Sequence, residues 1–239
     1  MALADVVMTS DARATPARHA SAAFLGFTVL LFAPLATAQD RKVGSEFRVN
    51  NATVENQEQV SVAADSEGNF VVVWKSDHLS SEGEIFGRRY DSAGSALGDE
   101  FLVNSSPTGT QREPAVAAAS NGAFVVVWNS PDNYGVVARR FSSSGASQGS
   151  EFVVGAPTDA PRYPAVAADS EGNFVVVWEV QNGVPGDPEP PGVVGQRFSS
   201  AGAALGDEFV LSSVTTGSQT HPAVGMSADG SFVVTWENL

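Results

Sequence analysis

The chain has 239 residues, a formal net charge of −14 and no cysteine. Such an acidic surface offers no basic patch that could release counterions from a phosphate backbone, so we expect no nucleic-acid partner. Without cysteine the protein forms no disulfide, and its stability has to come from buried apolar surface.

Residues 1–38 have the pattern of a secretory signal peptide. Arg13, Arg18 and His19 precede the apolar run AAFLGFTVLLFAPLA, and an A-x-A cleavage site ends at Ala38. The run is shorter than the about 20 residues of a membrane span, although an uncleaved anchor is the alternative. The acidic residues before Arg13 are unusual for a signal, so a start at Met8 is also open. We expect a secreted or extracytoplasmic protein, in the periplasm or at the cell surface, with no membrane association after cleavage.

The rest of the chain, residues 39–239, repeats one pattern four times. Each copy contains the run F-V-V-(V/T)-W, which ends at one of the four tryptophans, Trp74, Trp128, Trp178 and Trp236. A period of about 50 residues is typical of propellers and solenoids. The repeats lie near 46–99, 100–150, 151–207 and 208–239, and the last is incomplete.

Four short segments in each repeat favour β-strands. The first is P-A-V-A-A or a variant of it, near Gln59, Pro114, Pro164 and Pro222. The second, F-V-V-V-W, is apolar without alternation, as expected of a strand buried on both faces. The third ends at Tyr90, Phe141 and Phe198 in three of the repeats, and the fourth opens at Glu46, Glu100, Glu151 and Glu208. A propeller blade packed between two other blades provides such burial, with the small first strand innermost.

The connections agree with an all-β fold. The turn between the first two segments carries a glycine in every copy, at Gly68, Gly122, Gly172 and Gly230, and glycine supplies the positive φ of a tight turn. The sequence therefore predicts a β-propeller-like array of four-stranded antiparallel blades. The opening strand, 47–50, could join the last pair in a four-bladed closure with a defective blade. We favour the alternative, a fragment of a larger propeller, because unpaired edges invite aggregation.

The combination of P-A-V-A, D-x-x-G-x-F-V-V-V-W, G-Q-R-F-x-x-x-G and E-F-x-V-N resembles β-propeller-like repeats of large exported bacterial proteins. The resemblance extends from Glu46 to Trp236. It implies an extracytoplasmic interaction role, often beside adhesion or calcium-binding modules, and attaches no activity to the motif.

The sequence contains few residue patterns that are typical of a metal site or a catalytic site. Asp65, Glu67 and Asn69 place oxygens at alternate positions, as calcium loops do. The second copy has no carboxylate there, so we expect a plain turn, no metal and no cofactor, with calcium as the weaker alternative. The turn also differs in spacing from the sialidase D-x-G-x-T-W motif. The repeated arginines Arg89, Arg140 and Arg197 are expected to be structural. No nucleophile elbow, P-loop or dinucleotide fingerprint occurs.

Loops that differ between the repeats are the better candidates for a ligand site. We expect the loops before the first strand and after the second strand to meet at one face, around the channel mouth. The candidate ligand-binding residues, with an ordinary solvated loop face as the alternative for each, are Arg112, Arg162, Tyr163 and His221 at the mouth and Asp77, His78, Asp132 and Tyr134 further out.

These observations lead to the expectation of a protein that is not an enzyme, namely an exported binding or adhesion scaffold for a protein or glycan. Two alternatives stay open. One is a propeller enzyme acting on polysaccharide, similar to a sialidase or glycosidase, and the other is a structural spacer from a larger surface protein.

Overall fold

The structure is a computed structural model that describes residues 5–9, 46–51, 54–79, 82–105, 109–132, 135–155, 160–183, 191–211 and 217–239. For residues 5–9 it describes the backbone alone. The described residues divide into two units, and the fold discussed below is that of the unit formed by 1–10 and 49–239. Among the described residues no helix occurs, and hence none that could cross a membrane.

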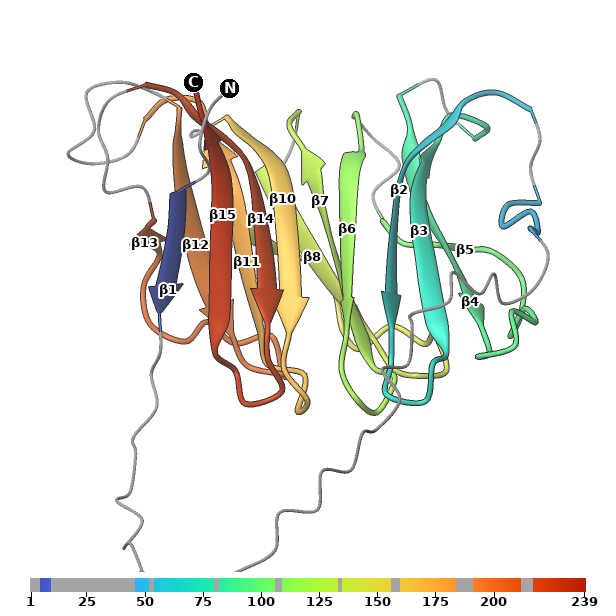
Figure 1. The fold of residues 1–239 in the computed structure, drawn as a ribbon. Coiled ribbons are helices and arrows are strands. Elements are labelled where there is room, and N and C mark those ends of the chain that lie inside the picture. The colour runs from blue at the N-terminus through green and yellow to red at the C-terminus, as the bar shows by residue number, and fades with distance from the viewer. Residues whose placement is uncertain are drawn as a thin grey trace, which may run out of the picture. The chain divides into compact units, whose positions relative to one another are not determined.

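The unit is all-β and consists of four antiparallel sheets, as the sequence predicts (Figure 1). Three are complete four-stranded blades in which each strand pairs with the next one along the chain. Blade 1 contains β2 (Gln57–Ala64), β3 (Phe70–Ser76), β4 (Glu84–Tyr90) and β5 (Phe101–Leu102). Blade 2 contains β6 (Arg112–Ala118), β7 (Phe124–Ser130), β8 (Gly135–Phe141) and β9 (Phe152–Gly155). Blade 3 contains β10 (Pro161–Ala168), β11 (Phe174–Val180), β12 (Gly192–Phe198) and β13 (Phe209–Val210).

Blade 4 has three strands, in the order β14 (Gln219–Met226), β15 (Phe232–Asn238) and β1 (Asp5–Thr9). β1 pairs antiparallel with β15 and so occupies the position of a third strand. The sequence instead suggested that residues 47–50 could join this pair. β1 also lies within the expected signal peptide, so cleavage after Ala38 would remove it from the sheet.

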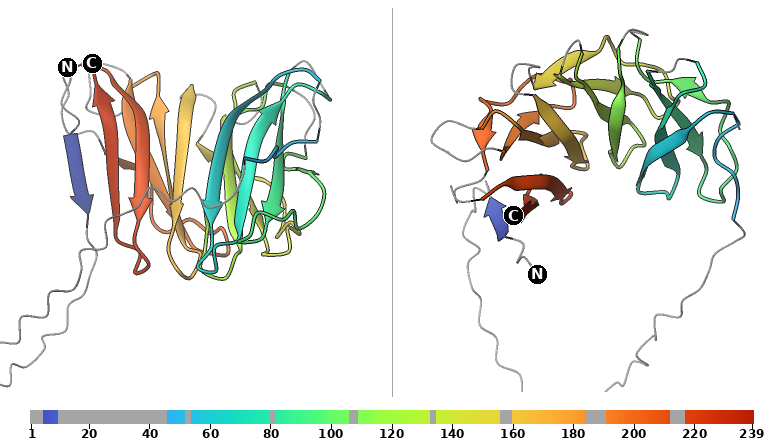
Figure 2. Two further views of the ribbon diagram at one scale, coloured as in Figure 1. Left: turned by 45° about the vertical axis from the view of Figure 1, so that its right-hand side comes forward. Right: turned by 90° about the horizontal axis from the view of Figure 1, so that it is seen from above.

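The blades follow one another in chain order, and Figure 2 (right) shows blades 1 and 4 at the two ends of the row. The first strand of each blade contacts the first strand of the next, from β2 through β6 and β10 to β14. The second strands of blades 2 and 3, β7 and β11, are buried along their whole length. This burial explains why the F-V-V-V-W run does not alternate, because both faces of the strand meet a neighbouring blade.

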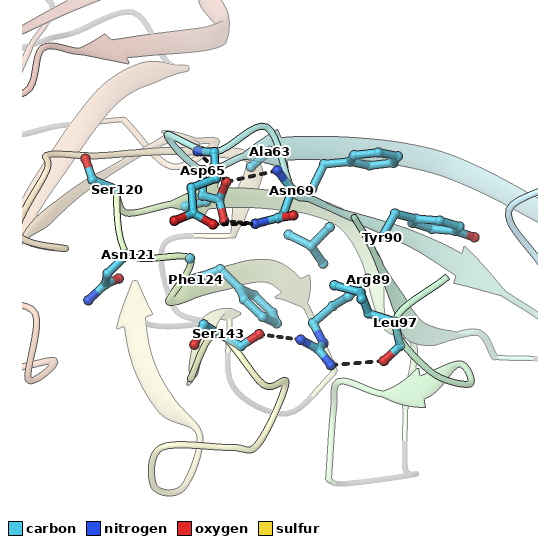
Figure 3. Close-up of a pocket in the computed structure, with 15 residues that line it drawn as sticks. Ala63, Asp65, Asn69, Arg89, Tyr90, Leu97, Ser120, Asn121, Phe124 and Ser143 are labelled. Atoms are coloured by element: carbon cyan, nitrogen blue, oxygen red, sulfur yellow. Dashed lines mark hydrogen bonds between the residues drawn. The ribbon is translucent and has the colours of Figure 1, made fainter. Parts of the chain in front are cut away.

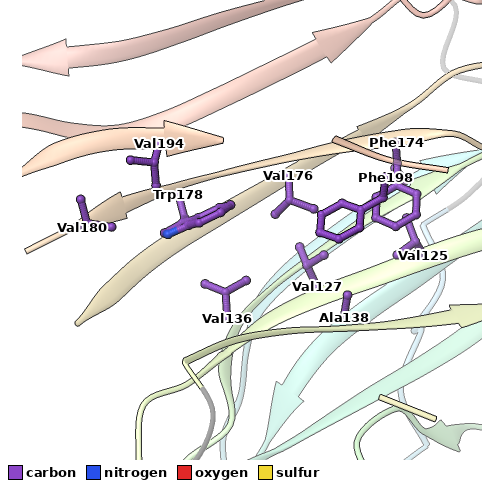
Figure 4. Close-up of a cluster of buried hydrophobic side chains, with 11 residues drawn as sticks. Val125, Val127, Val136, Ala138, Phe174, Val176, Trp178, Val180, Val194 and Phe198 are labelled. Carbon is purple, nitrogen blue, oxygen red and sulfur yellow. The ribbon is translucent and has the colours of Figure 1, made fainter. Parts of the chain in front are cut away.

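The core lies between the blades. Figure 4 shows the cluster between blades 2 and 3, where Val125 and Val127 of β7 face Val176 and Trp178 of β11. Corresponding clusters lie between blades 1 and 2 and between blades 3 and 4. Each buried tryptophan contributes about 2 kcal/mol or more to stability, and it does so only with a neighbouring blade in place.

Candidate functional site

A β-bulge interrupts the first strand of every blade, at the end opposite the turn that joins the first two strands. The pairing register shifts at this point in all four sheets. The residue at the centre of each bulge has positive φ although it is not glycine, and these residues are Gln59, Glu113, Tyr163 and His221. Such backbone is uncommon for residues with a side chain, and its recurrence in all four blades makes the bulge itself part of the architecture.

The bulges of blades 2, 3 and 4 are each tied to the previous blade by a hydrogen bond from the backbone. The N–H of Glu113 donates to Gln59 Oε1 at 2.8 Å, and the N–H of Tyr163 donates to Glu113 Oε2 at 2.8 Å. The N–H of His221 donates to Glu179 Oε2 at 3.3 Å. The strained backbone is therefore held by polar side chains of the neighbouring blade.

We name Glu113, Tyr163, Glu179 and His221 the rim site. The rings of Tyr163 and His221 lie against each other, with their centroids 4.2 Å apart. Glu113 accepts a hydrogen bond from the backbone of Tyr163 and Glu179 accepts one from the backbone of His221, so each carboxyl group is bonded to one of the two residues whose rings meet. A buried carboxyl, a second carboxyl and an aromatic surface thus come from three consecutive blades.

Glu179 is buried beneath blade 4. Burial raises the pKa of its carboxyl above the ordinary value, while the backbone N–H of His221 lowers this pKa in part. Its Oε1 accepts a hydrogen bond from the side chain of Gln181. A carboxyl with a raised pKa carries a proton at higher pH than an exposed one, as a general acid requires.

The other predicted residues lie at the same end of the blades. Arg112 is half-buried, and its Nε lies 3.8 Å from Glu113 Oε1. Arg162 pairs across the sheet with Glu179. Both arginines therefore flank the rim site. Sequence analysis named Arg112, Arg162, Tyr163 and His221 but missed Glu113 and Glu179. Glu113 has the position of Gln59 in blade 1, and Glu179 has the position of Lys75. The acidic residue at each of these positions is the sequence signal that could have identified the two glutamates.

Three predicted residues lie away from the rim site. Asp77 Oδ1 is 3.0 Å from Lys75 Nζ, and the His78 ring lies 4.6 Å from the Phe86 ring. Asp132 accepts a hydrogen bond from the N–H of Thr110 at 2.9 Å, which lowers its pKa. These contacts are all within blades 1 and 2 and their loops. Tyr134 lies outside the described residues.

Cavities lie at the opposite end of the blades. One of about 290 Å³ lies between blades 1 and 2 and is shown in Figure 3, with Asp65, Asn69 and Arg89 in its wall. A second of about 600 Å³ has the corresponding place between blades 2 and 3. Because they recur with the blades and the repeated arginines line both, we attribute them to the architecture. Arg89 and Arg140 each donate to the backbone of the next blade, at Ser143 and Ser200.

In the turns considered as weak calcium candidates, the aspartate oxygens accept hydrogen bonds from within the same turn. Asp65 Oδ1 accepts the N–H groups of Glu67 and Asn69, and Asp65 Oδ2 accepts the Asn69 side chain, each at 2.9 Å. Asp169 makes the corresponding bonds in blade 3. Within the described part of the chain, no three His, Asp or Glu residues are grouped to hold a metal.

No family model matches this chain, and no curated protein matches it. Solved structures with a similar backbone include a GH43 endo-arabinanase from Bacillus licheniformis, with a TM-score of 0.44, 14% identity and 70% of this chain covered. They also include a Hadza microbial sialidase, with a TM-score of 0.49, 9% identity and 70% covered. An α-L-arabinofuranosidase from Lactobacillus brevis has a TM-score of 0.41, 11% identity and 71% covered. The chain spans 62%, 39% and 62% of these proteins, respectively.

All three proteins are named as glycosidases, and this finding corrects two expectations. The expectation of a non-enzymatic binding or adhesion scaffold was wrong, and so was the expectation that the protein is not an enzyme. Sequence reasoning favoured a scaffold because the repeat itself carries no catalytic pattern. TM-scores below 0.5 transfer no activity to this chain, so an activity has to be argued from the rim site.

Proposed function

We propose that this protein is a propeller-type glycosidase that acts on polysaccharide outside the cytoplasm. The observation that carries the proposal is the rim site, where two carboxyl side chains from consecutive blades are bonded to the backbone of two residues whose aromatic rings lie against each other. Hydrolysis of a glycosidic bond needs two carboxyl groups, one as acid and one as base or nucleophile.

The two carboxyl groups have different environments, as the two roles demand. Glu179 is buried and has a raised pKa, so it serves as the acid that protonates the leaving oxygen. Glu113 accepts hydrogen bonds from the Tyr163 N–H and from Asn129 Nδ2, at 2.8 and 3.2 Å. These bonds hold its carboxyl group in place, which suits a base or nucleophile.

The surroundings of the carboxyl groups suit a sugar. Tyr163 and His221 present ring surface that can stack on the C–H face of a sugar ring, and His221 Nδ1 lies 3.5 Å from Glu237 Oε2. Arg112 and Arg162 flank the site, and the buried Arg112 Nε makes no hydrogen bond among the described residues but lies 3.8 Å from Glu113 Oε1. A guanidinium in this place favours a glycan that carries carboxylate groups.

The site of action follows from the N-terminal pattern. Residues 1–38 combine a basic segment, an apolar run and an A-x-A site, which supports export. The F-V-V-V-W and G-Q-R-F motifs support assignment to the repeat type of large exported bacterial proteins.

The test is a hydrolysis screen of the purified protein. Neutral and acidic polysaccharides and aryl glycosides would be assayed for released reducing ends, with wild type, Glu179→Gln and Glu113→Gln. We expect activity on at least one substrate and losses of about 100-fold or more in both variants. The matched control is Glu171→Gln, in an exposed turn at the other end of blade 3, which should keep full activity. No hydrolysis by wild type, or equal rates in all variants, would overturn the proposal.

A further inference from the structure

In the part of the chain that the structure describes, blades 1 and 4 each carry one apolar sheet face that no neighbouring blade covers. On blade 1 the face that points away from blade 2 carries Val60 and Val62, with exposed fractions of 71% and 62%. On blade 4 the face that points away from blade 3 carries Val233, which is 37% exposed. Exposed apolar residues grouped on one sheet face mark an interaction surface. We name these two surfaces the leading face of blade 1 and the trailing face of blade 4.

The same positions are buried wherever a neighbouring blade exists. Val62 corresponds to Val116 of blade 2, because each pairs with the third residue of the following F-V-V-V-W strand, and Val116 is only 6% exposed. Val233 corresponds to Val175 of blade 3, which is fully buried. The two faces are therefore the two halves of an interface that this chain already builds three times.

Residues 49–51, which precede the first strand of blade 1, lie against its leading face. The Val49 carbonyl accepts hydrogen bonds from Arg88 at 3.0 Å and from Tyr90 at 2.8 Å, and the N–H of Asn51 donates to Glu100. Val49 also packs against the cluster of Val72, Trp74 and Phe86. The outer half of this face is covered as a result, while Val60 and Val62 on the inner half are not.

Blade 2 receives the outermost strand of blade 1 through the same contacts. The Val103 carbonyl accepts a hydrogen bond from Arg139 at 2.6 Å, as Val49 does from Arg88. The N–H of Ser105 donates to Glu151, as Asn51 does to Glu100. Residues 49–51 therefore occupy, beside blade 1, the position that an outermost strand of a preceding blade would have. The inner strands of such a blade are not among the described residues.

The two faces also carry polar groups that complement each other. Glu237 of blade 4 has the position of Glu179 in blade 3, but it is exposed, with its Oε2 3.5 Å from His221 Nδ1, whereas Glu179 is buried. Glu179 accepts the bulge N–H of the next blade, from His221. Gln59, whose φ of 56° matches that of His221, carries the corresponding bulge on the leading face of blade 1. A carboxylate on one face thus complements a backbone donor on the other.

We propose that two copies of this chain join head to tail, with the trailing face of blade 4 of each copy on the leading face of blade 1 of the other. Residues 49–51 of one copy then complete the composite blade whose inner strands are β14 and β15 of the other. Two such contacts close a ring of eight blades, which is within the range that propellers adopt. The inference does not rest on the proposed function.

The first experiment measures the mass of the purified protein by size-exclusion chromatography with light scattering. Wild type is expected at twice the mass of one chain. Val62→Glu and Val233→Glu should each be monomeric, with dissociation constants raised at least about a hundredfold, because each places unpaired charges in both contacts of the ring. The matched control is Val153→Glu on the outer strand β9, which is 51% exposed and should leave the dimer intact.

Mixing the two monomeric variants tests the head-to-tail arrangement. In the mixed ring one contact joins the unchanged Val233 of one copy to the unchanged Val62 of the other, so we expect dimers to return. A contact of like faces would give no recovery and would overturn the proposal, as would a monomeric wild type or an oligomer larger than two. Val62 is already exposed in one copy, so its variant should fold, and Val60→Glu provides a second variant for the same face.

Discussion

The indole N–H of Trp128 is a buried donor whose acceptor can be removed by one substitution. It donates to Gln111 Oε1 at 2.9 Å, and Gln111 itself is buried and donates to the Gly109 carbonyl at 3.2 Å. In Gln111→Ala the indole loses this acceptor in a place that excludes water, which costs about 1–3 kcal/mol. The cavity left by the shortened side chain adds to this, so we expect a loss of about 2–4 kcal/mol in the free energy of unfolding.

The measurement is thermal and urea unfolding of wild type and Gln111→Ala. For a protein of this size the expected loss corresponds to a melting temperature lower by about 5–12 °C. The control is Pro161→Ala, because Pro161 has the same position in blade 3 and the Trp178 indole N–H there has no acceptor among the described residues. That variant should lose about 1 kcal/mol or less. Equal losses in the two variants would refute the reasoning.

Three further predictions concern other parts of the molecule. Gly202 and Gly206 both have φ of +82°, but an added Cβ would lie 2.8 Å from Arg140 Nε at Gly202 and in open space at Gly206. Urea unfolding should therefore show a loss of about 1–2 kcal/mol for Gly206→Ala and at least about 1 kcal/mol more for Gly202→Ala; equal losses would contradict the clash. Because burial raises the pKa of Glu179 in the folded state, its contribution to stability is full below its ordinary value of 4.5 and is lost as pH rises through the folded pKa. The melting temperature of Glu179→Gln should rise relative to wild type across that window, and a difference that does not vary with pH would speak against a buried acid. Millimolar calcium should leave the melting temperature unchanged, because the turn carboxylates are used within their turns, and a clear upward shift would revive the calcium alternative.

Much of the fold could be predicted from the repeated pattern. The continuous F-V-V-V-W run specifies a strand buried on both faces, and the glycine two residues before each run marks the turn. Gly68, Gly122, Gly172 and Gly230 all have positive φ in the structure, as expected for these turns. Local residues decide these features, so one copy of the pattern is enough to infer them.

The third strand of blade 4 could not be predicted in the same way. Its residues, Asp5–Thr9, share no pattern with the third strands of the other blades and lie within an apparent signal peptide. β1 pairs with β15 through backbone hydrogen bonds, which carry little sequence information. Pairing of this kind depends on which edge is free, and that is a property of the assembled sheet.

The rim site could be predicted only in part. Its position followed from the loops that differ between repeats, which pointed to Tyr163 and His221. The bulges were not predicted, because the four residues with positive φ at their centres, Glu113 and its equivalents, are of four different types. Glu179 was also missed, since it ends a buried F-V-V-V-W strand and its carboxyl is covered by the next blade. Burial by a distant segment is a tertiary property that the local pattern does not show.

The most direct test of the proposed function is a crystal structure of Glu179→Gln with a bound oligosaccharide, chosen from the substrates that wild type cleaves. The account predicts a sugar ring on the Tyr163 and His221 rings, with the glycosidic oxygen within hydrogen-bond reach of the residue 179 side chain. An oligosaccharide bound instead in the cavity beside Arg89, or at any place away from the two carboxyl groups, would contradict it.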